Sequence, residues 1–122
     1  MGNTNDYKFG YELHVKLRQG DKFFGKGVAQ LLSNIEKFGS LQRSAAEMGL
    51  AYSKAWSVIK KAEDRLGFPL TQRKIGGIGG GGSSLTEEGK EFLKRFTDFE
   101  SAIYQSTDKL FEEFFSDYRK DK

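Results

Sequence analysis

Three features of the chain predict an α+β architecture: two short helices that pack closely, a glycine-tipped hairpin, and one long final helix. The helices lie between residues 40 and 66, where Ala45 and Ala46 are followed by Gly49. Alanines let two helix axes approach closely, and glycine gives the turn between them its backbone freedom. The hairpin is marked by six glycines around Ile78. Together these features predict a winged helix-turn-helix with a small antiparallel sheet and a long C-terminal helix.

The N-terminal part is expected to form a strand and a helix. Apolar and polar residues alternate from Tyr11 to Arg18, which predicts a strand with one solvated face, and Gly20 marks the turn after it. Gly39 is expected to end the helix that follows. The apolar residues of that helix have amphipathic spacing, at Val28, Leu31, Leu32 and Ile35.

Two further helices are expected between residues 40 and 67. Ser40 is a suitable N-cap for the first, which should run to about Met48. The second should start near Tyr52 and end at Gly67, with Pro69 at the expected distance beyond that end.

The last third of the chain should contain the wing and the final helix. Residues 70–75 and 83–85 are expected to pair as strands around the glycine tract. Thr86 should cap the final helix, with Glu87 and Glu88 near its positive end. No proline interrupts the segment up to Tyr118, so one helix is expected there. Residues 1–85 then form the winged helix-turn-helix domain, and residues 86–122 form a C-terminal helix of the same unit.

Composition and charge restrict the possible functions. The chain has no cysteine, which excludes disulfides, thiolate metal sites and a cysteine nucleophile. It has neither an apolar run of membrane-spanning length nor the apolar stretch of a signal peptide, so we expect no membrane partner and a cytoplasmic location. Residues 36–75 carry eight Lys and Arg against four Asp and Glu, whereas residues 86–122 carry seven against ten. A basic centre followed by an acidic helix favours contact of the centre with nucleic acid.

The predicted contact surface is centred on the third helix. On a helical wheel, Ser53, Ser57 and Lys60 lie opposite its apolar face. Short hydroxyl side chains can approach the floor of a DNA groove, while lysines at its rim meet phosphates. Trp56 lies at the border and is interpreted as a packing residue. The predicted DNA-binding residues are Ser40, Gln42, Arg43, Tyr52, Ser53, Lys54, Ser57, Lys60, Lys61, Arg73, Lys74, Gly79 and Gly80.

The final helix is expected to form a homodimer. Its apolar residues recur at spacings of three and four, and their surface is too large to leave in water. Pairing about a twofold axis would present two third helices to an inverted-repeat site in double-stranded DNA. The predicted dimerisation residues are Phe96, Phe99, Ile103, Leu110, Phe111, Phe114, Phe115 and Tyr118.

Alternatives from other functional classes remain open. A protein-interaction module could use the same fold, with the acidic C-terminal helix as its docking surface. A nucleotide-dependent enzyme is suggested only by the spacing of Gly77, Gly79 and Gly82, but the second strand of a dinucleotide-binding unit is missing. His14, the one histidine, has no nearby partner for metal binding or catalysis. We therefore expect no enzyme activity, cofactor or metal.

The run from Gly39 to Leu93 resembles the N-terminal winged helix-turn-helix domain of molybdate-dependent (ModE-type) transcriptional regulators and, more distantly, LysR-type DNA-binding domains. The matching pieces are AAEMG, SKAW, LGFPLTQR, GGIGGGG and LTEEG. The resemblance implies a homodimeric transcription regulator whose third helix enters the major groove. It implies DNA contacts at Ser40, Arg43, residues 52–57, Arg73 and the glycine wing. The chain ends at Lys122, so no molybdate-binding domain is expected within it.

Overall fold

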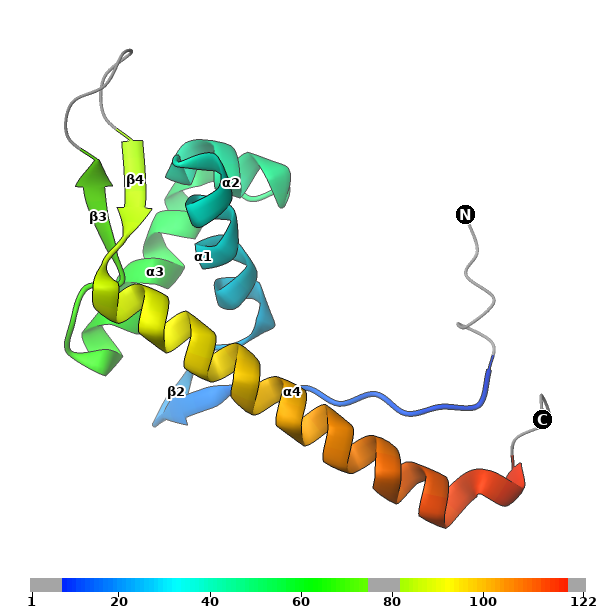
Figure 1. Cartoon of the computed structure of the whole chain (residues 1–122). Coiled ribbons are helices and arrows are strands. Elements are labelled where there is room, and N and C mark those ends of the chain that lie inside the picture. Colours follow the sequence, from blue (N-terminus) through cyan, green and yellow to red (C-terminus); the bar gives the residue numbers. More distant parts are fainter. Residues whose placement is uncertain (1–7, 75–81, 119–122) are drawn as a thin grey trace.

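The computed structural model describes residues 8–74 and 82–118 (Figure 1). These residues form β1 (Leu17–Gln19), β2 (Asp21–Phe24), α1 (Lys26–Phe38), α2 (Leu41–Glu47), α3 (Tyr52–Leu66), β3 (Thr71–Lys74), β4 (Gly82–Leu85), α4 (Glu87–Phe115) and the 3-10 helix η2 (Ser116–Tyr118). Helices α2 and α3 are the helix-turn-helix, and β3 with β4 is the wing. The predicted α+β winged helix-turn-helix fold with a long C-terminal helix is confirmed.

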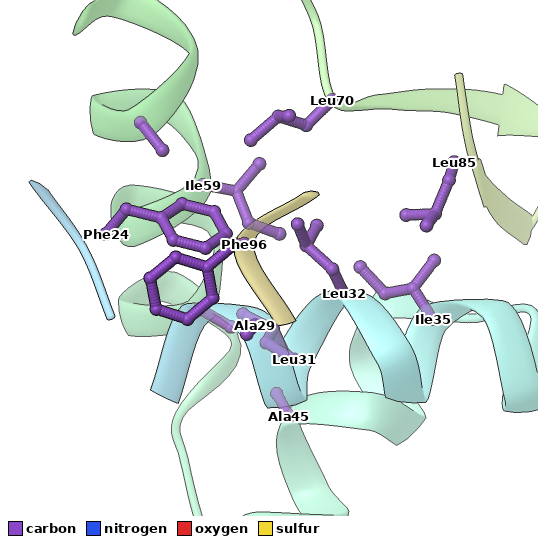
Figure 2. Close-up of a cluster of buried hydrophobic side chains, with 12 residues drawn as sticks. Phe24, Ala29, Leu31, Leu32, Ile35, Ala45, Ile59, Leu70, Leu85 and Phe96 are labelled. Atoms are coloured by element: carbon purple, nitrogen blue, oxygen red, sulfur yellow. The ribbon is translucent and has the colours of Figure 1, made fainter. Parts of the chain in front are cut away.

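One apolar core joins the first three helices, the wing and the start of α4 (Figure 2). Helix α1 contributes Leu31 and Leu32, which are fully buried because its apolar residues recur on one side. Phe96 of α4 closes the core against Phe24 of β2, with ring centroids 5.0 Å apart. The remaining core residues are Ala29, Ile35, Ala45, Ala55, Ile59, Ala62, Leu70 and Leu85.

The helix ends agree closely with the sequence signals. Gly39, at φ 69°, ends α1, and Gly49, also at φ 69°, lies in the turn between α2 and α3. The Ser40 hydroxyl accepts a hydrogen bond from the backbone N–H of Arg43 at 3.0 Å and so caps α2. The Thr86 hydroxyl caps α4 in the same way, accepting from the backbone N–H of Gly89 at 2.9 Å.

The wing is attached to the end of α1. Strands β3 and β4 are antiparallel, with the register running from Thr71 opposite Leu85 to Lys74 opposite Gly82. The backbone N–H of Ser83 donates to the carbonyl oxygen of Gly39 at 2.9 Å. A Cβ at Gly82 would lie 2.5 Å from that oxygen, so only glycine permits this approach. The wing root therefore has a defined position relative to the helices.

The expected strand over residues 11–18 is wrong for most of its length. Within the described residues, only Leu17 and Arg18 of that segment belong to a strand, β1, which pairs with β2 in a second two-stranded sheet. Residues 11–16 have no strand partner and instead run beside α4 (Figure 1). The alternation is nevertheless real, because Leu13, Val15 and Leu17 are half-buried while Glu12, His14 and Lys16 are exposed.

Two tyrosine hydroxyls join this N-terminal segment to α4. Tyr104 donates to the carbonyl oxygen of Leu13 at 3.2 Å, and Tyr11 donates to the carboxylate of Asp108. The hydrogen bond to Asp108 raises the pKa of Tyr11 to about 12. The segment therefore finds its hydrogen-bond partners on a helix rather than on another strand.

The expected helix up to Tyr118 is also shortened. Helix α4 ends at Phe115, and the chain continues as the 3-10 turn η2. Across the described ranges, we find no helix with the length and apolar character needed to traverse a lipid bilayer.

Candidate nucleic-acid interface

Helix α3 is oriented as its pattern predicts. Ala55, Ile59 and Ala62 are buried in the core. The opposite side, which carries Ser53 and Ser57, is therefore exposed. Lys54 and Lys60 are exposed on either side of these serines. The exposed side of α3 thus combines two short hydroxyl side chains with two lysines.

A depression of about 660 Å³ lies beside α3. It is bounded by the start of α2, one flank of α3 and the root of the wing. Five of the predicted DNA-binding residues line it, namely Ser40, Gln42, Tyr52, Lys60 and Arg73. Its other lining residues are Leu41, Trp56, Ile59, Glu63, Pro69, Thr71, Gln72, Gly82 and Ser83. The fold therefore brings together residues that are up to 43 positions apart in the sequence.

Glu63 connects α3 to the wing. One oxygen of its carboxylate accepts the backbone N–H groups of Leu70, at 2.8 Å, and Thr71, at 3.2 Å. The other oxygen lies 3.5 Å from the Lys60 ammonium. Since the Glu63 side chain is only 11% exposed, these contacts are partly shielded from water. They set the position of β3 relative to α3.

Lys61 lies apart from the other predicted residues. Its ammonium contacts the Asp21 carboxylate at 2.7 Å, and the Arg65 guanidinium contacts the other Asp21 oxygen at 2.7 Å. Hydrogen bonds from Lys61 and then Arg65 hold the pKa of Asp21 well below its usual range. Lys61 thus faces the β1–β2 hairpin and does not line the depression. The helical wheel placed Lys61 beside the exposed face of α3. It contained no information about the hairpin that Lys61 contacts.

The remaining predicted residues flank α3. Gln42 and Arg43 are exposed at the start of α2, and the Arg43 guanidinium lies over the Phe38 ring, 4.5 Å from its centroid. Arg73 and Lys74 are exposed on β3, with the Lys74 ammonium beside Gly39. Gly79 and Gly80 lie outside the described residues.

The interpretation of Trp56 as a packing residue is wrong. Its side chain is 51% exposed, and the Lys60 ammonium lies over the indole, 5.6 Å from the ring centroid. Ala55 and Ile59 occupy the buried side of α3 at this level, and Trp56 points about 100° away from Ala55 around the helix. The only sequence signal was the position of Trp56 at the border of the apolar face on the helical wheel. That position did not distinguish a buried indole from an exposed one.

The predicted dimerisation residues fall into different surroundings. Phe96 is buried in the core and is not available to a partner. Phe111 is buried beneath Phe9 and Tyr11, whose ring centroids lie 5.5 Å and 5.2 Å from its own, and Phe115 also contacts Phe9. Ile103 is half-buried. The exposed members are Phe99, Leu110, Phe114, Phe115 and Tyr118.

No set of three or more His, Asp or Glu side chains within residues 8–74 and 82–118 is arranged to hold a metal ion.

The exposed surface of α3 combines hydroxyl groups, lysine ammonium groups and aromatic rings. Such a surface is suited to contacting phosphates and base edges.

Residues 29–90, half of the chain, match the family described as bacterial regulatory helix-turn-helix protein, lysR family. The chain is 34% identical over 83 residues to the molybdenum transport protein ModE of Azotobacter vinelandii, covering 68% of this chain and 31% of that protein. It is 31% identical over 86 residues to the molybdenum-pterin-binding protein MopB of Rhodobacter capsulatus, covering 70% of this chain and 32% of that protein.

It is also 33% identical over 66 residues to the DNA-binding transcriptional dual regulator ModE of Escherichia coli (strain K12), covering 54% of this chain and 25% of that protein. The chain thus spans no more than about a third of the length of these relatives. The matched family region contains α2, α3 and the wing, the same elements that form the exposed basic surface. The chain therefore belongs to the lysR family of bacterial regulatory helix-turn-helix proteins and carries the DNA-binding domain of a transcription regulator.

Proposed function

We propose that the protein acts in the cytoplasm as a homodimeric transcription regulator that reads an inverted-repeat DNA site. Helix α3 enters the major groove, and the glycine-rich wing lies beside it. The observation that carries the proposal is the exposed side of α3, where Ser53 and Ser57 stand between Lys54 and Lys60. Short hydroxyls reach base edges, and the flanking ammonium groups reach phosphates.

The neighbouring elements support this docking. Arg73 at the wing root and Gln42 at the start of α2 both line the depression beside α3. A DNA strand that passes between α3 and the wing would meet both residues. Glu63 would hold β3 at the separation from α3 that this passage requires.

Dimerisation is supported by the surface of α4. Leu110 is 53% exposed and Phe114 is 67% exposed, and Phe99 lies on the same side of the helix, within about 60° of both on a helical wheel. These three residues form an exposed apolar seam along α4. Two copies paired along this seam would cover it and place two α3 helices on one side of the dimer. Half-sites should then be centred about one helical turn of DNA, or a multiple of it, apart.

The experiment that tests the proposal is selection of bound duplexes from a random pool. The proposal expects an enriched motif with inverted symmetry. If about four cations of each protomer reach phosphates, the log–log salt dependence of affinity should have a slope of about −7. A slope near zero together with no enriched duplex would overturn DNA binding and favour the protein-interaction module.

Matched substitutions locate the contact surface. Lys54→Ala and Arg73→Ala should each weaken binding to all duplexes about equally and, since each removes one phosphate contact from both protomers, reduce the magnitude of the salt slope by about 1.8. Ser57→Ala should instead alter sequence preference at one position. Lys94→Ala, which removes the same charge from α4, is the control and should leave affinity nearly unchanged. Equal loss from Lys94→Ala would show that binding follows net charge rather than this surface.

A further inference from the structure

The depression beside α3 contains two large aromatic side chains that are about half exposed. Trp56, the one tryptophan of the chain, is 51% exposed, and Tyr52, one turn earlier, is 53% exposed. Both line the depression. An indole left half in water beside an otherwise polar surface gains free energy when a ligand covers it, and exposed apolar surface of this kind marks contact sites.

Polar contacts hold the indole in place. The Lys60 ammonium lies 5.6 Å from its centroid, and Lys60 in turn contacts Glu63 at 3.5 Å. Glu63 is bound to the backbone of the wing at Leu70 and Thr71. Lys60, whose ammonium faces the ring, is therefore linked through Glu63 to the start of β3.

The chemistry of the major groove limits what this ring can recognise. Nearly all groups that base pairs present there are hydrogen-bond donors or acceptors, and the apolar exception is the C5-methyl group of thymine. The indole ring has a large apolar edge and a single N–H donor. Trp56 lies between Ser53 and Ser57 in sequence and on the flank of the same exposed surface, so a base edge that reaches these serines also comes near the ring.

We propose that Trp56 is a specificity-determining residue that recognises the methyl group of a thymine within each half-site. This inference rests on the proposed function, since it places α3 in the major groove. Contact of the indole with a deoxyribose ring would also be apolar, but it would carry no sequence information. Replacing thymine by uracil removes only the methyl group and therefore separates the two contacts.

The experiment uses the full chain and the duplex enriched by selection, with each thymine replaced by uracil in turn. Affinity should fall about fourfold at one position of each half-site, the effect expected from losing one buried methyl group. Trp56→Ala should bind the thymine and uracil duplexes equally at that position. Trp56→Phe should restore part of the difference. Tyr52→Ala, the control with matched exposure on the same helix, should keep the difference.

Each outcome bears on the inference. An enriched duplex that tolerates uracil at every position, or contains no thymine, overturns it while leaving DNA binding intact. Discrimination that persists in Trp56→Ala assigns the methyl contact to another residue and also overturns it. A uniform loss of affinity in Trp56→Ala, without a change in discrimination, places the indole on the DNA backbone and overturns it as well. If no duplex is enriched, the proposed function itself fails.

Discussion

At the scale of single residues, Gly89 shows why a small residue is needed at the start of α4. A Cβ at this position would lie 2.2 Å from the carbonyl oxygen of Leu70. The same oxygen accepts the backbone N–H of Thr86 at 3.0 Å, and the Thr86 hydroxyl donates to Pro69 at 2.7 Å. The Leu-Thr-x-x-Gly pattern thus combines a helix cap, two hydrogen bonds to the segment between α3 and β3, and a close backbone contact.

Gly89→Ala should therefore destabilise the fold. Helix propensity alone favours alanine by about 1 kcal/mol, but the contact with Leu70 requires the backbone to shift, at a cost of about 1–3 kcal/mol or more. We expect a net decrease in the free energy of unfolding, measured by denaturant titration. Gly27→Ala in α1 is the control, because a Cβ there meets nothing within 4 Å, and it should be neutral or slightly stabilising. A more stable Gly89→Ala protein would contradict the close contact.

Asp21 is a second position where one side chain has a testable effect. Because its pKa is lowered by Lys61 and Arg65, its carboxylate stabilises the fold above the ordinary carboxyl pKa of about 4, and this contribution is lost as the pH falls. Wild type should be more stable than Asp21→Asn at pH 7, and the gap should narrow below about pH 4. Asp98→Asn, which breaks a pair within α4 alone, is the control. A gap independent of pH would show that the ion pairs do not cause it.

At the scale of elements, local signals predicted most of the helices. Caps and C-terminal glycines act within one turn, so Ser40, Gly39 and Gly67 located the helix ends to within about a residue. Partners across the fold were not predictable in this way. Period-two alternation identifies an extended chain with one covered face, but not whether a strand or a helix covers it. Tyr11 and Leu13 are hydrogen-bonded to α4 rather than to a strand, and the β1–β2 hairpin was missed because its strands are only three and four residues long.

The candidate site was predictable to a similar degree. Burial of one side of α3 determines which residues are exposed, so Ser53, Ser57 and Lys60 followed from periodicity alone. The environments of Lys61 and Trp56 depend on the hairpin and on the depression, which are formed by segments distant in sequence. A single helical wheel contains no information about either neighbour.

Glu63, which joins α3 to the start of β3, should affect both the stability of the fold and the position of the wing. Glu63→Gln removes the negative charge that strengthens the two backbone hydrogen bonds and pairs with Lys60. If the amide oxygen keeps the bonds to Leu70 and Thr71, the NH2 group faces the Lys60 ammonium and the ion pair is lost. We expect a loss of about 1–3 kcal/mol in the free energy of unfolding. We also expect weaker duplex binding at a temperature where the variant is fully folded. Asp64→Asn, the exposed neighbour with the same change in charge, should alter neither quantity by much. Unchanged affinity in folded Glu63→Gln would show that the wing position is set elsewhere.

At the scale of the whole molecule, α4 has different roles along its length. Its 29 residues extend about 44 Å, and the second half runs beyond the helical core (Figure 1). The first half closes the core through Phe96. In the second half, Phe111 and Phe115 face the N-terminal segment, whereas Leu110 and Phe114 lie about 100° away on the helix and are largely exposed. The apolar surface left for a partner is thus a narrow seam.

Charged side chains in this seam should prevent dimerisation. Leu110→Glu combined with Phe114→Glu places two carboxylates where two α4 helices would meet, so the charges repel and must lose water on pairing. We expect wild type to sediment as a dimer at micromolar concentration and the double variant as a folded monomer that binds a single half-site more weakly. Lys109→Glu is the control, because it changes net charge by the same amount on the same stretch of helix and should remain dimeric. A wild-type chain that sediments as a monomer, or a double variant that remains a dimer, would show that the protomers do not pair through this seam.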